Sequence, residues 1–215
     1  MNNPWKEISL LDYENHMSLD SVQQLQCMNH LMKEQFSAFP VTSAMVLGVA
    51  GGNGLEHVDA CKYKKVYGVD INSDYLFAVK ERYSNLSGTL ECLCVDLTNE
   101  YEKLPHAELI IANLLIEYIG YECFFKVVKK VNPKYVSCVI QINTDETQWV
   151  SDSPYLHAFD RLDEVHHQMS EKELCACFEK AKYKLISSKD NALPNGKKLV
   201  KVDFAGLDPI KEILI

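Results

Sequence analysis

The sequence predicts an α/β fold in which seven strands form a mostly parallel sheet, with an antiparallel C-terminal hairpin and helices on both faces. Three observations support this prediction. From residue 44 onward, short apolar runs alternate with helical patterns, as in a parallel sheet. The first run ends in a glycine-rich turn, and the last two runs flank an Asn-Gly dipeptide, which favours a hairpin. The 215 residues, 47% of them hydrophobic, suit one domain over residues 41–215, preceded by a helical lid over residues 1–40.

The N-terminal segment lies outside the alternating pattern. Residues 1–17 are polar and aromatic without a clear period. Ser18 or Asp20 is expected to cap a helix that runs to about Phe36, because both residue types accept hydrogen bonds from free N–H groups at a helix start. Apolar residues recur at helical spacing along this helix and form one apolar face, which needs a partner to cover it. These residues are Val22, Leu25, Met28, Met32 and Phe36.

Five apolar runs are expected to form the parallel strands, with helical patterns between them. The expected strands are residues 45–50, 66–70, 90–95, 108–113 and 135–142. The expected helices are residues 55–61, 73–83, 97–103 and 121–131. Ser73 is a good N-cap for the second of these helices, and Pro133 ends the fourth because proline cannot continue a helix.

The last third of the chain departs from this alternation. Residues 144–169 have no clean period, although they contain several aromatic side chains and histidines. Ser170 and Glu173 have capping-box spacing and predict a helix to about Lys182. The last two strands are expected at residues 183–188 and 197–204, on either side of Pro194-Asn195-Gly196.

Composition excludes several classes of partner. The formal net charge of −8 and the pI of about 5.4 argue against a nucleic-acid partner, since such proteins usually carry a basic face. No apolar run reaches the length of a membrane span, and the N-terminus lacks the layout of a signal peptide, so we expect a cytoplasmic monomer or homodimer. The eight cysteines contain no C-x-x-C pair, so we expect them to be reduced and expect no metal site.

A glycine-rich turn follows the first expected strand. Residues 45–54 read MVLGVAGGNG, with four glycines within seven residues: Gly48, Gly51, Gly52 and Gly54. Glycine has no Cβ and tolerates positive φ, so such a turn lets the backbone approach a ligand closely. The helix expected after the turn would direct its free N–H groups at the same ligand. Together with the polar residues at later strand ends, this turn predicts a nucleotide site.

Two families place a glycine turn after the first strand. The dinucleotide fingerprint G-x-G-x-x-G/A, read from Gly52, has His57 where a small residue is required, which counts against a nicotinamide or flavin cofactor. The sequence instead resembles the class I S-adenosylmethionine-dependent methyltransferases, whose motif reads acidic-x-G-x-G-x-G. Gly52 and Gly54 match that motif. Ala50 replaces its first glycine, and Gly48 replaces its acidic residue.

The resemblance covers roughly residues 40–204 and implies a Rossmann-like fold that binds S-adenosyl-L-methionine and releases S-adenosyl-L-homocysteine. At the end of its second strand the family has an acidic residue that accepts hydrogen bonds from both ribose hydroxyls; Asp70 occupies this place, unless it only forms a turn. Asp96 fits the family's adenine contact and equally fits an N-cap. The implied cofactor-binding residues are Gly48, Ala50, Gly51, Gly52, Gly54, Asp70, Ile71, Asp96, Leu97 and Asn113.

The methyl acceptor is expected to lie among residues 13–17, residues 113–118 and the long segment after the fifth strand. His16 would orient the acceptor or take its proton, because histidine titrates near working pH. For each histidine, a surface or structural role is the alternative. The catalytic candidates are His16, Tyr13 and Glu117, and the substrate-binding candidates are Tyr13, His16, Tyr118, Tyr155 and His157.

The resemblance therefore implies a methyltransferase acting on a small-molecule acceptor through oxygen, nitrogen or sulfur. The methyl donor is already activated, so the protein mainly orients the reactants and excludes water, and the sequence identifies the cofactor better than the acceptor. Asn113 is followed by Leu114-Leu115 instead of the Pro-Pro-aromatic signature of amino-group methyltransferases, which disfavours exocyclic base amines. The alternative is a non-catalytic protein of the same fold that binds S-adenosylmethionine or a partner, which Gly48 favours.

Overall fold

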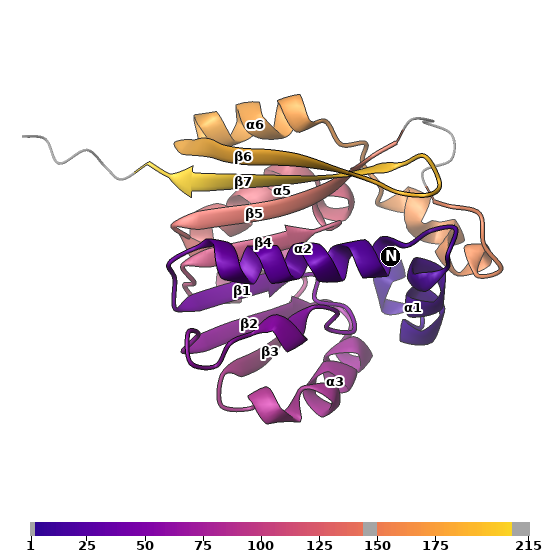
Figure 1. The fold of residues 1–215 in the computed structure, drawn as a ribbon, viewed down its shortest axis with the longest axis horizontal. Coiled ribbons are helices and arrows are strands. Elements are labelled where there is room, and N and C mark those ends of the chain that lie inside the picture. The colour runs from indigo at the N-terminus through magenta and orange to yellow at the C-terminus, as the bar shows by residue number, and fades with distance from the viewer. Residues whose placement is uncertain (1–2, 144–149, 208–215) are drawn as a thin grey trace, which may run out of the picture.

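A seven-stranded sheet forms the centre of the computed structural model, which describes residues 3–143 and 150–207. The strand order is β3-β2-β1-β4-β5-β7-β6, and only β7 runs antiparallel to its neighbours β5 and β6 (Figure 1). This topology confirms the predicted parallel sheet with its antiparallel C-terminal hairpin. The strands are β1 Ser43–Leu47, β2 Lys65–Asp70, β3 Leu90–Cys94, β4 Leu109–Asn113, β5 Tyr135–Ile142, β6 Tyr183–Ala192 and β7 Lys198–Gly206.

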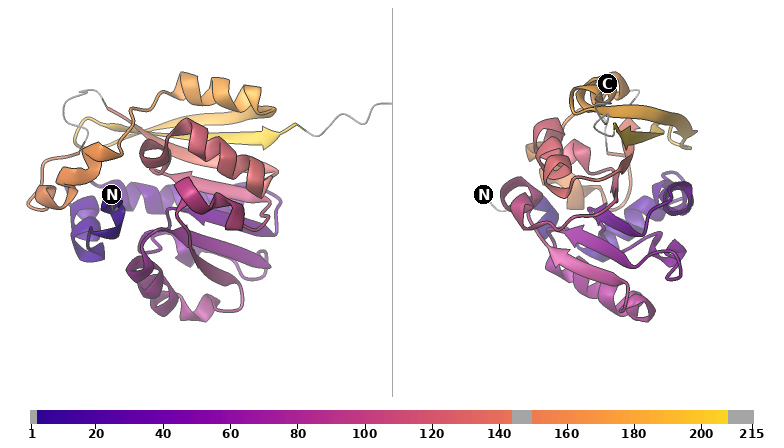
Figure 2. Two further views of the ribbon diagram at one scale, coloured as in Figure 1. Left: turned by 180° about the vertical axis from the view of Figure 1, so that it is seen from behind. Right: turned by 90° about the vertical axis from the view of Figure 1, so that its left-hand side faces the viewer.

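Helices cover both faces of the sheet, as predicted (Figures 1 and 2). One face carries α2 (Gln24–Ala38) and α3 (Ser73–Arg82). The other carries α4 (Leu97–Glu100), α5 (Ile116–Val131) and α6 (Glu171–Lys180). Strand β1 is buried on both sides: Met45 and Leu47 belong to one core cluster, and Ala44 and Val46 belong to the other. Its continuous apolar run follows from this two-sided burial.

The N-terminal segment contains more structure than the sequence predicted. A short 3₁₀ helix, η1 (Pro4–Lys6), precedes α1 (Leu10–Ser18), which begins after Ser9 because the Ser9 hydroxyl accepts the Asp12 N–H at 3.1 Å. The expected caps are wrong. Ser18 ends α1, Asp20 lies in the turn, and α2 starts only after Gln23, which has a left-handed φ of 50° and no capping side chain.

The helix expected at residues 55–61 is also wrong. The chain there forms only η2 (Leu55–His57), followed by a turn. Gly54 precedes it at φ 92° without a side-chain cap. The Asp59 carboxylate then accepts the Cys61 N–H at 2.8 Å, which stabilises a turn in place of another helical turn. The expected helix over residues 121–131 is present, but α5 also includes a preceding helical segment from Ile116, separated from it by a kink at Gly120 (φ 70°, ψ 164°). The helix after β3 divides into α4 and η4 (Tyr101–Lys103).

The C-terminal third follows the predicted caps and turn. The Ser170 hydroxyl accepts the Glu173 N–H at 3.4 Å and starts α6. Gly196 adopts φ 79° in the β6–β7 turn. The segment without a clean period contains η5 (Leu156–Glu164), which contacts α1 beyond the ends of the strands (Figure 1). Residues 144–149, including Trp149, lie outside the described residues.

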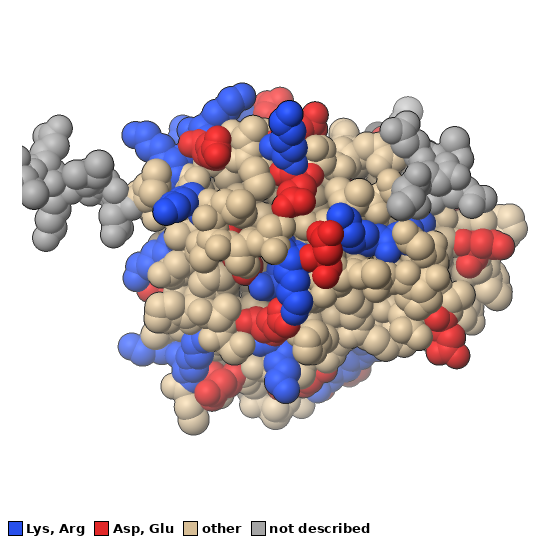
Figure 3. Space-filling model, turned by 45° about the horizontal axis from the view of Figure 1, so that its top comes forward, with Lys and Arg blue, Asp and Glu red and all other residues tan. Residues whose placement is uncertain are grey.

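The structure shows how the charged side chains and the cysteines are distributed. Acidic and basic side chains are interspersed on the face drawn in Figure 3. All eight cysteines are free. Within residues 3–143 and 150–207, no helix combines the length and the apolar character that a membrane crossing requires.

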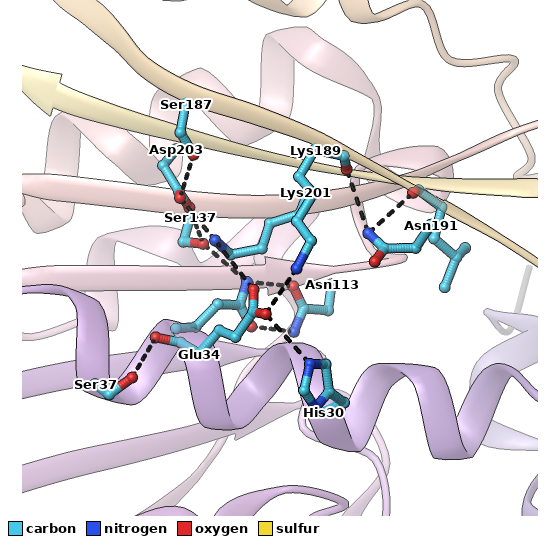
Figure 4. Close-up of polar contacts among 12 residues, drawn as sticks. His30, Glu34, Ser37, Asn113, Ser137, Ser187, Lys189, Asn191, Lys201 and Asp203 are labelled. Carbon is cyan, nitrogen blue, oxygen red and sulfur yellow. Dashed lines mark hydrogen bonds and ion pairs between the residues drawn. The ribbon is translucent and has the colours of Figure 1, made fainter.

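A buried polar network fastens α2 to the sheet (Figure 4). On β7, the Lys201 ammonium lies 2.8 Å from the Asp203 carboxylate, and both side chains are about 5% exposed. The Ser137 hydroxyl of β5 donates to Asp203 and also accepts from Gln35 of α2 at 2.9 Å. Gln35 continues the network to Asn113, at the end of β4. Helix α2 is therefore held by polar contacts as well as by its apolar face.

Candidate functional site

A cavity of ≈ 700 Å³, including the space open to solvent at its mouth, lies at the carboxyl ends of β1, β2, β3 and β4. We call it the first cavity. It is lined after β1 by Gly48 and Ala50, after β2 by Asp70 and Ile71, after β3 by Asp96 and Leu97, and after β4 by Asn113. Trp5 and Tyr13 from the N-terminal segment also line it. Ligands of open α/β sheets bind at this position.

Asp70 anchors the glycine turn and lines the first cavity at the same time. One carboxylate oxygen accepts the Ala50 N–H at 2.9 Å, and the other accepts the Asn72 N–H at 2.9 Å. Burial raises the pKa of Asp70, and these backbone hydrogen bonds oppose that shift. A carboxylate has about four lone-pair sites, so those that the backbone N–H groups of Ala50, Ile71 and Asn72 do not occupy remain for a ligand.

The glycines of the turn serve two different purposes. Gly48 (φ 66°) and Ala50 (φ 45°) line the first cavity, so their backbone approaches whatever binds there. At Gly52 (φ 84°), a Cβ would lie 2.7 Å from Cε2 of Tyr83, and at Gly54 (φ 92°) it would lie 2.5 Å from Cβ of Met32. Neither glycine lines the cavity, so their conformation and the packing of α2 and α3 explain them better than ligand contact.

Replacing Gly52 with valine is therefore expected to destabilise the fold and not only to block a ligand. Positive φ in a β-branched residue adds strain on the order of 1–3 kcal/mol, and the Cβ would collide with the Tyr83 ring. Denaturant unfolding measures the loss. Gly88→Val is the matched control, because nothing lies within 4 Å of a Cβ at Gly88. Equal stability of the two variants would contradict this explanation.

Asp96 and Leu97, which the resemblance assigned to the adenine, both line the first cavity, and the N-cap alternative for Asp96 is realised. Asp96 lines the first cavity and accepts the Thr98 N–H at 3.0 Å as the N-cap of α4. Its partial burial raises its pKa, but the hydrogen bonds from Thr98 and Asn99 outweigh burial, so the pKa of Asp96 lies below its usual value. Leu97 is buried beside it.

The Asn113 side chain is already committed to the protein. Its amide nitrogen donates to the Gln35 carbonyl at 2.8 Å, and its own carbonyl accepts from Gln35 at 2.9 Å. The next residue, Leu114, has a left-handed φ of 52° and turns the chain along the cavity wall. Asn113 therefore positions the turn after β4, and its side chain binds α2.

The N-terminal segment closes over the first cavity through contacts to three elements of the sheet domain. The Asn72 side-chain amide donates to the Trp5 carbonyl at 3.0 Å, and the Tyr75 hydroxyl donates to the Ile8 carbonyl at 2.9 Å. Glu14 of α1 forms a two-point ion pair with Arg82 of α3, which also donates to the Gly51 carbonyl at 3.0 Å. These contacts join α1, the glycine turn and α3.

A second cavity of ≈ 600 Å³, including open space at its mouth, adjoins the first. Trp5, Tyr13, Leu114 and Tyr118 line both, so these residues form a shared wall. On its other sides the second cavity is lined by residues of α1, α2, α5, β5 and the segment after β5. These are His16, Met17, Gln24, Glu117, Gln141, Val150, Ser151, Phe159, Leu162 and His166.

Glu117 is a buried acid in the wall of the second cavity. Its side chain is 4% exposed, and its Oε1 accepts the Gln141 N–H at 2.8 Å. Its Oε2 is buried and has no hydrogen-bond partner among the described residues. Burial raises the pKa of Glu117 to about 7, although hydrogen bonds from the backbone of Gln141 on β5 and of Glu117 itself oppose this shift.

His16 lies across the second cavity on α1. Its Nδ1 and the Ser153 hydroxyl are 2.8 Å apart, and its ring packs against Phe159 with centroids 4.7 Å apart. Burial and the nearby Lys197 ammonium lower the pKa of His16, and both effects favour the neutral imidazole. The structure thus brings together Tyr13, His16, Glu117 and Tyr118, which are distant in the sequence.

The other candidates lie elsewhere. His157 does not line either cavity: its side chain is 94% exposed and faces Asp160. Tyr155 packs beside the cluster of Ile8, Phe159 and Leu162 and does not line the cavities. Sequence reasoning missed Trp5 and Phe159 as lining residues. In the sequence, both residues are only aromatic residues in segments without periodicity, and this property does not predict where in the fold they lie.

Comparison with known proteins supports the fold. No protein-family model and no curated protein matches the sequence. Among solved structures, the chain is similar to the N-methyltransferase NodS from Bradyrhizobium japonicum WM9 in complex with S-adenosyl-L-homocysteine (TM-score 0.65, 12% identity, covering 95% of this chain and 99% of NodS). It is also similar to a putative S-adenosylmethionine-dependent methyltransferase from Listeria monocytogenes (TM-score 0.59, 16% identity, covering 83% and 97%). The chain therefore has the class I methyltransferase fold.

Proposed function

We propose that this chain is an S-adenosylmethionine-dependent methyltransferase acting on a small molecule. The observation that carries the proposal is Asp70, whose carboxylate is held by the glycine turn at the edge of the first cavity with lone pairs to spare. One solved structure that is similar to this chain contains bound S-adenosylhomocysteine, and another contains bound S-adenosylmethionine. The second cavity, on the other side of a shared wall, would hold the acceptor.

The residues present fit that cofactor. Asp70 would accept hydrogen bonds from the two ribose hydroxyls, and Asp96 and Leu97 would contact the adenine. The backbone of Gly48 and Ala50 would lie along the methionine portion, where a Cβ at Gly48 would come within 3.1 Å of the Leu115 side chain. Bound S-adenosylmethionine supplies an activated methyl group, so the chain itself must bind, orient and exclude water.

Titration calorimetry tests the cofactor, and a single-turnover assay tests the chemistry. S-adenosylmethionine and S-adenosylhomocysteine should bind, whereas NAD⁺ should not. Incubation with S-adenosylmethionine and a metabolite extract should then yield S-adenosylhomocysteine together with a product heavier by one methylene. Binding of NAD⁺ without binding of either sulfur compound would overturn the proposal.

The alternative is a protein of this fold that binds S-adenosylmethionine without transferring its methyl group. Gly48 favours it, because the family's motif has an acidic residue there, and Leu115 occupies the space that such a side chain would need. The same single-turnover assay separates the two functions. Tight cofactor binding with no product from any extract would support the alternative.

We also propose that residues 3–22 act as a lid. The segment reaches the sheet domain through the Trp5 and Ile8 carbonyls and the Glu14–Arg82 ion pair, whereas α2 packs into the core beneath it. Closure of such a segment would exclude water from the transfer and bring His16 to the acceptor.

Cofactor binding is expected to slow hydrogen exchange in α1. Saturation with S-adenosylhomocysteine should protect amides of residues 10–18 by about tenfold or more, because a bound ligand fills the cavity that Trp5 and Tyr13 cover. Mass spectrometry of exchanged peptides measures the effect. Helix α6 is the control, since it lines neither cavity. Equal exchange of α1 with and without the ligand would leave the lid without support.

A further inference from the structure

The second cavity contains a hydrogen-bond acceptor that the described residues leave unpaired. Oε2 of Glu117 is buried without a partner, while Oε1 is held by the Gln141 N–H. Buried polar atoms in folded proteins nearly always have hydrogen-bond partners, because leaving one unpaired is unfavourable. No ion pair to Glu117 occurs among the described residues. The described residues therefore leave Oε2 of Glu117 open to a donor that a ligand would bring.

The walls around Glu117 are aromatic, and no described cation forms an ion pair with Glu117. The buried Lys197 ammonium lies near His16 and His166. The described lining residues include no lysine or arginine. The Trp5 ring meets the Tyr118 ring edge to face, with centroids 4.8 Å apart, and His166 lies beside Tyr118. Burial lowers the pKa of His16 and of His166, which favours their neutral forms. Aromatic faces around one carboxylate favour a cation that carries apolar carbon.

The alternatives fit less well. A carboxylate or phosphate on the acceptor would meet Glu117 with no cation in the lining to offset the repulsion. An alcohol can donate one hydrogen bond to Oε2, but it leaves the buried negative charge uncompensated. A thiol is a weaker donor still. An ammonium group provides both the donor and the charge.

We propose that the methyl acceptor is a basic primary or secondary amine, bound in the second cavity with its ammonium group on Oε2 of Glu117. The inference rests on the proposed function, since it names the substrate class of the same site. The carbon frame of the amine would lie against the aromatic rings of Trp5, Tyr118 and Phe159. The Trp5 indole N–H, which is buried and has no partner among the described residues, would donate to an acceptor atom brought by the bound ligands.

Glu117 then has a defined part in the transfer. An ammonium nitrogen has no lone pair, so one proton passes from the nitrogen to Oε2, leaving a neutral amine and a carboxylic acid. The amine lone pair forms the new N–C bond as the S–C bond breaks, and that bonding pair stays on sulfur. The product leaves as the methylated ammonium ion, and Glu117 returns its proton to water. The raised pKa of Glu117 suits this exchange of a proton.

Matched amines and alcohols test the inference by binding, independently of turnover. Protein saturated with S-adenosylhomocysteine is titrated calorimetrically with 2-phenylethylamine and 2-phenylethanol, benzylamine and benzyl alcohol, and hexylamine and hexan-1-ol. At least one amine should bind tenfold or more tightly than its alcohol. With S-adenosylmethionine instead, mass spectrometry should show the N-methylated form of that amine.

Two glutamate variants test whether Glu117 causes the tighter binding of the amine. Glu117→Gln should still bind S-adenosylhomocysteine but lose the preference for the amine. Glu122→Gln, an exposed position on the same helix, should keep it. If Glu117→Gln does not fold, Glu117→Asp replaces it and should reduce the preference, because the shorter side chain draws the carboxylate back.

The outcomes separate this inference from the proposed function. Failure of the wild-type protein to bind either S-adenosylmethionine or S-adenosylhomocysteine would overturn the function. If these compounds bind normally but amine and alcohol bind equally in every pair, only the inference that the acceptor is an amine is overturned. The same holds if no amine binds at 10 mM, a limit that corresponds to about 3 kcal/mol of binding free energy. A preference that survives in Glu117→Gln would overturn the role of Glu117.

Discussion

Asp70→Ala is expected to weaken binding of S-adenosylhomocysteine by at least about a hundredfold. A hydrogen bond to a charged group contributes about 1.5–3 kcal/mol, and two ribose hydroxyls would lose theirs together. The structure adds a second reason, since the Ala50 and Asn72 N–H groups lose the acceptor that shapes the glycine turn. Titration calorimetry measures the change in affinity.

Two further variants make this result specific to the Asp70 carboxylate. Asp74→Ala removes an exposed acid three residues after Ile71 and should bind like the wild type. Asp70→Asn keeps one acceptor oxygen and should lie between the wild type and Asp70→Ala. Because burial raises the pKa of Asp70, wild-type affinity should also fall with decreasing pH sooner than an exposed aspartate would allow. Unchanged affinity in Asp70→Ala would contradict the proposal that Asp70 binds the ribose hydroxyls.

Lys201→Met is expected to destabilise the protein by about 3–5 kcal/mol, because it leaves the Asp203 carboxylate buried without its ion-pair partner. The Ser137 and Ser187 hydroxyls still donate to Asp203, but they do not neutralise its charge. Since 1 kcal/mol corresponds to roughly 2–4 °C in a protein of this size, Tm should fall by roughly 6–20 °C. Denaturant and thermal unfolding both measure this loss.

An exposed ion pair provides the control for Lys201. Lys65 on β2 pairs with Glu91 on β3, and both side chains are largely in water. Lys65→Met should therefore change stability by less than about 1 kcal/mol. The double variant Lys201→Met/Asp203→Leu should recover most of the loss, because no buried charge is left unpaired. If Lys201→Met is as stable as Lys65→Met, the network in Figure 4 does not fasten α2 as we infer.

Local sequence patterns were sufficient where structure depends on neighbouring residues. The alternation of apolar runs predicted all seven strands, the Ser170 box predicted α6, and Asn195-Gly196 predicted the hairpin. The patterns failed where a contact in the folded chain outweighed a weak local preference for one secondary structure. Helix α1 was missed because its apolar side chains do not share one core: Tyr13 and Met17 line the second cavity, whereas Leu11 is exposed. After η2, the hydrogen bond to the Asp59 carboxylate stabilises a turn in place of the expected helix.

The sequence by itself determined the fold class and the strand ends that line the first cavity, Asp70 and Asp96 among them. Parallel strands end at one edge of a sheet, so residues that follow apolar runs must meet there. Only the tertiary structure decided where the second cavity lies and which residues line it. The cavity depends on the packing of η1, α1, α5 and η5, which brings Trp5, Glu117 and Phe159 together from three distant segments. Whether the Oε2 of Glu117 finds a partner depends on those long-range contacts, and no local pattern encodes them.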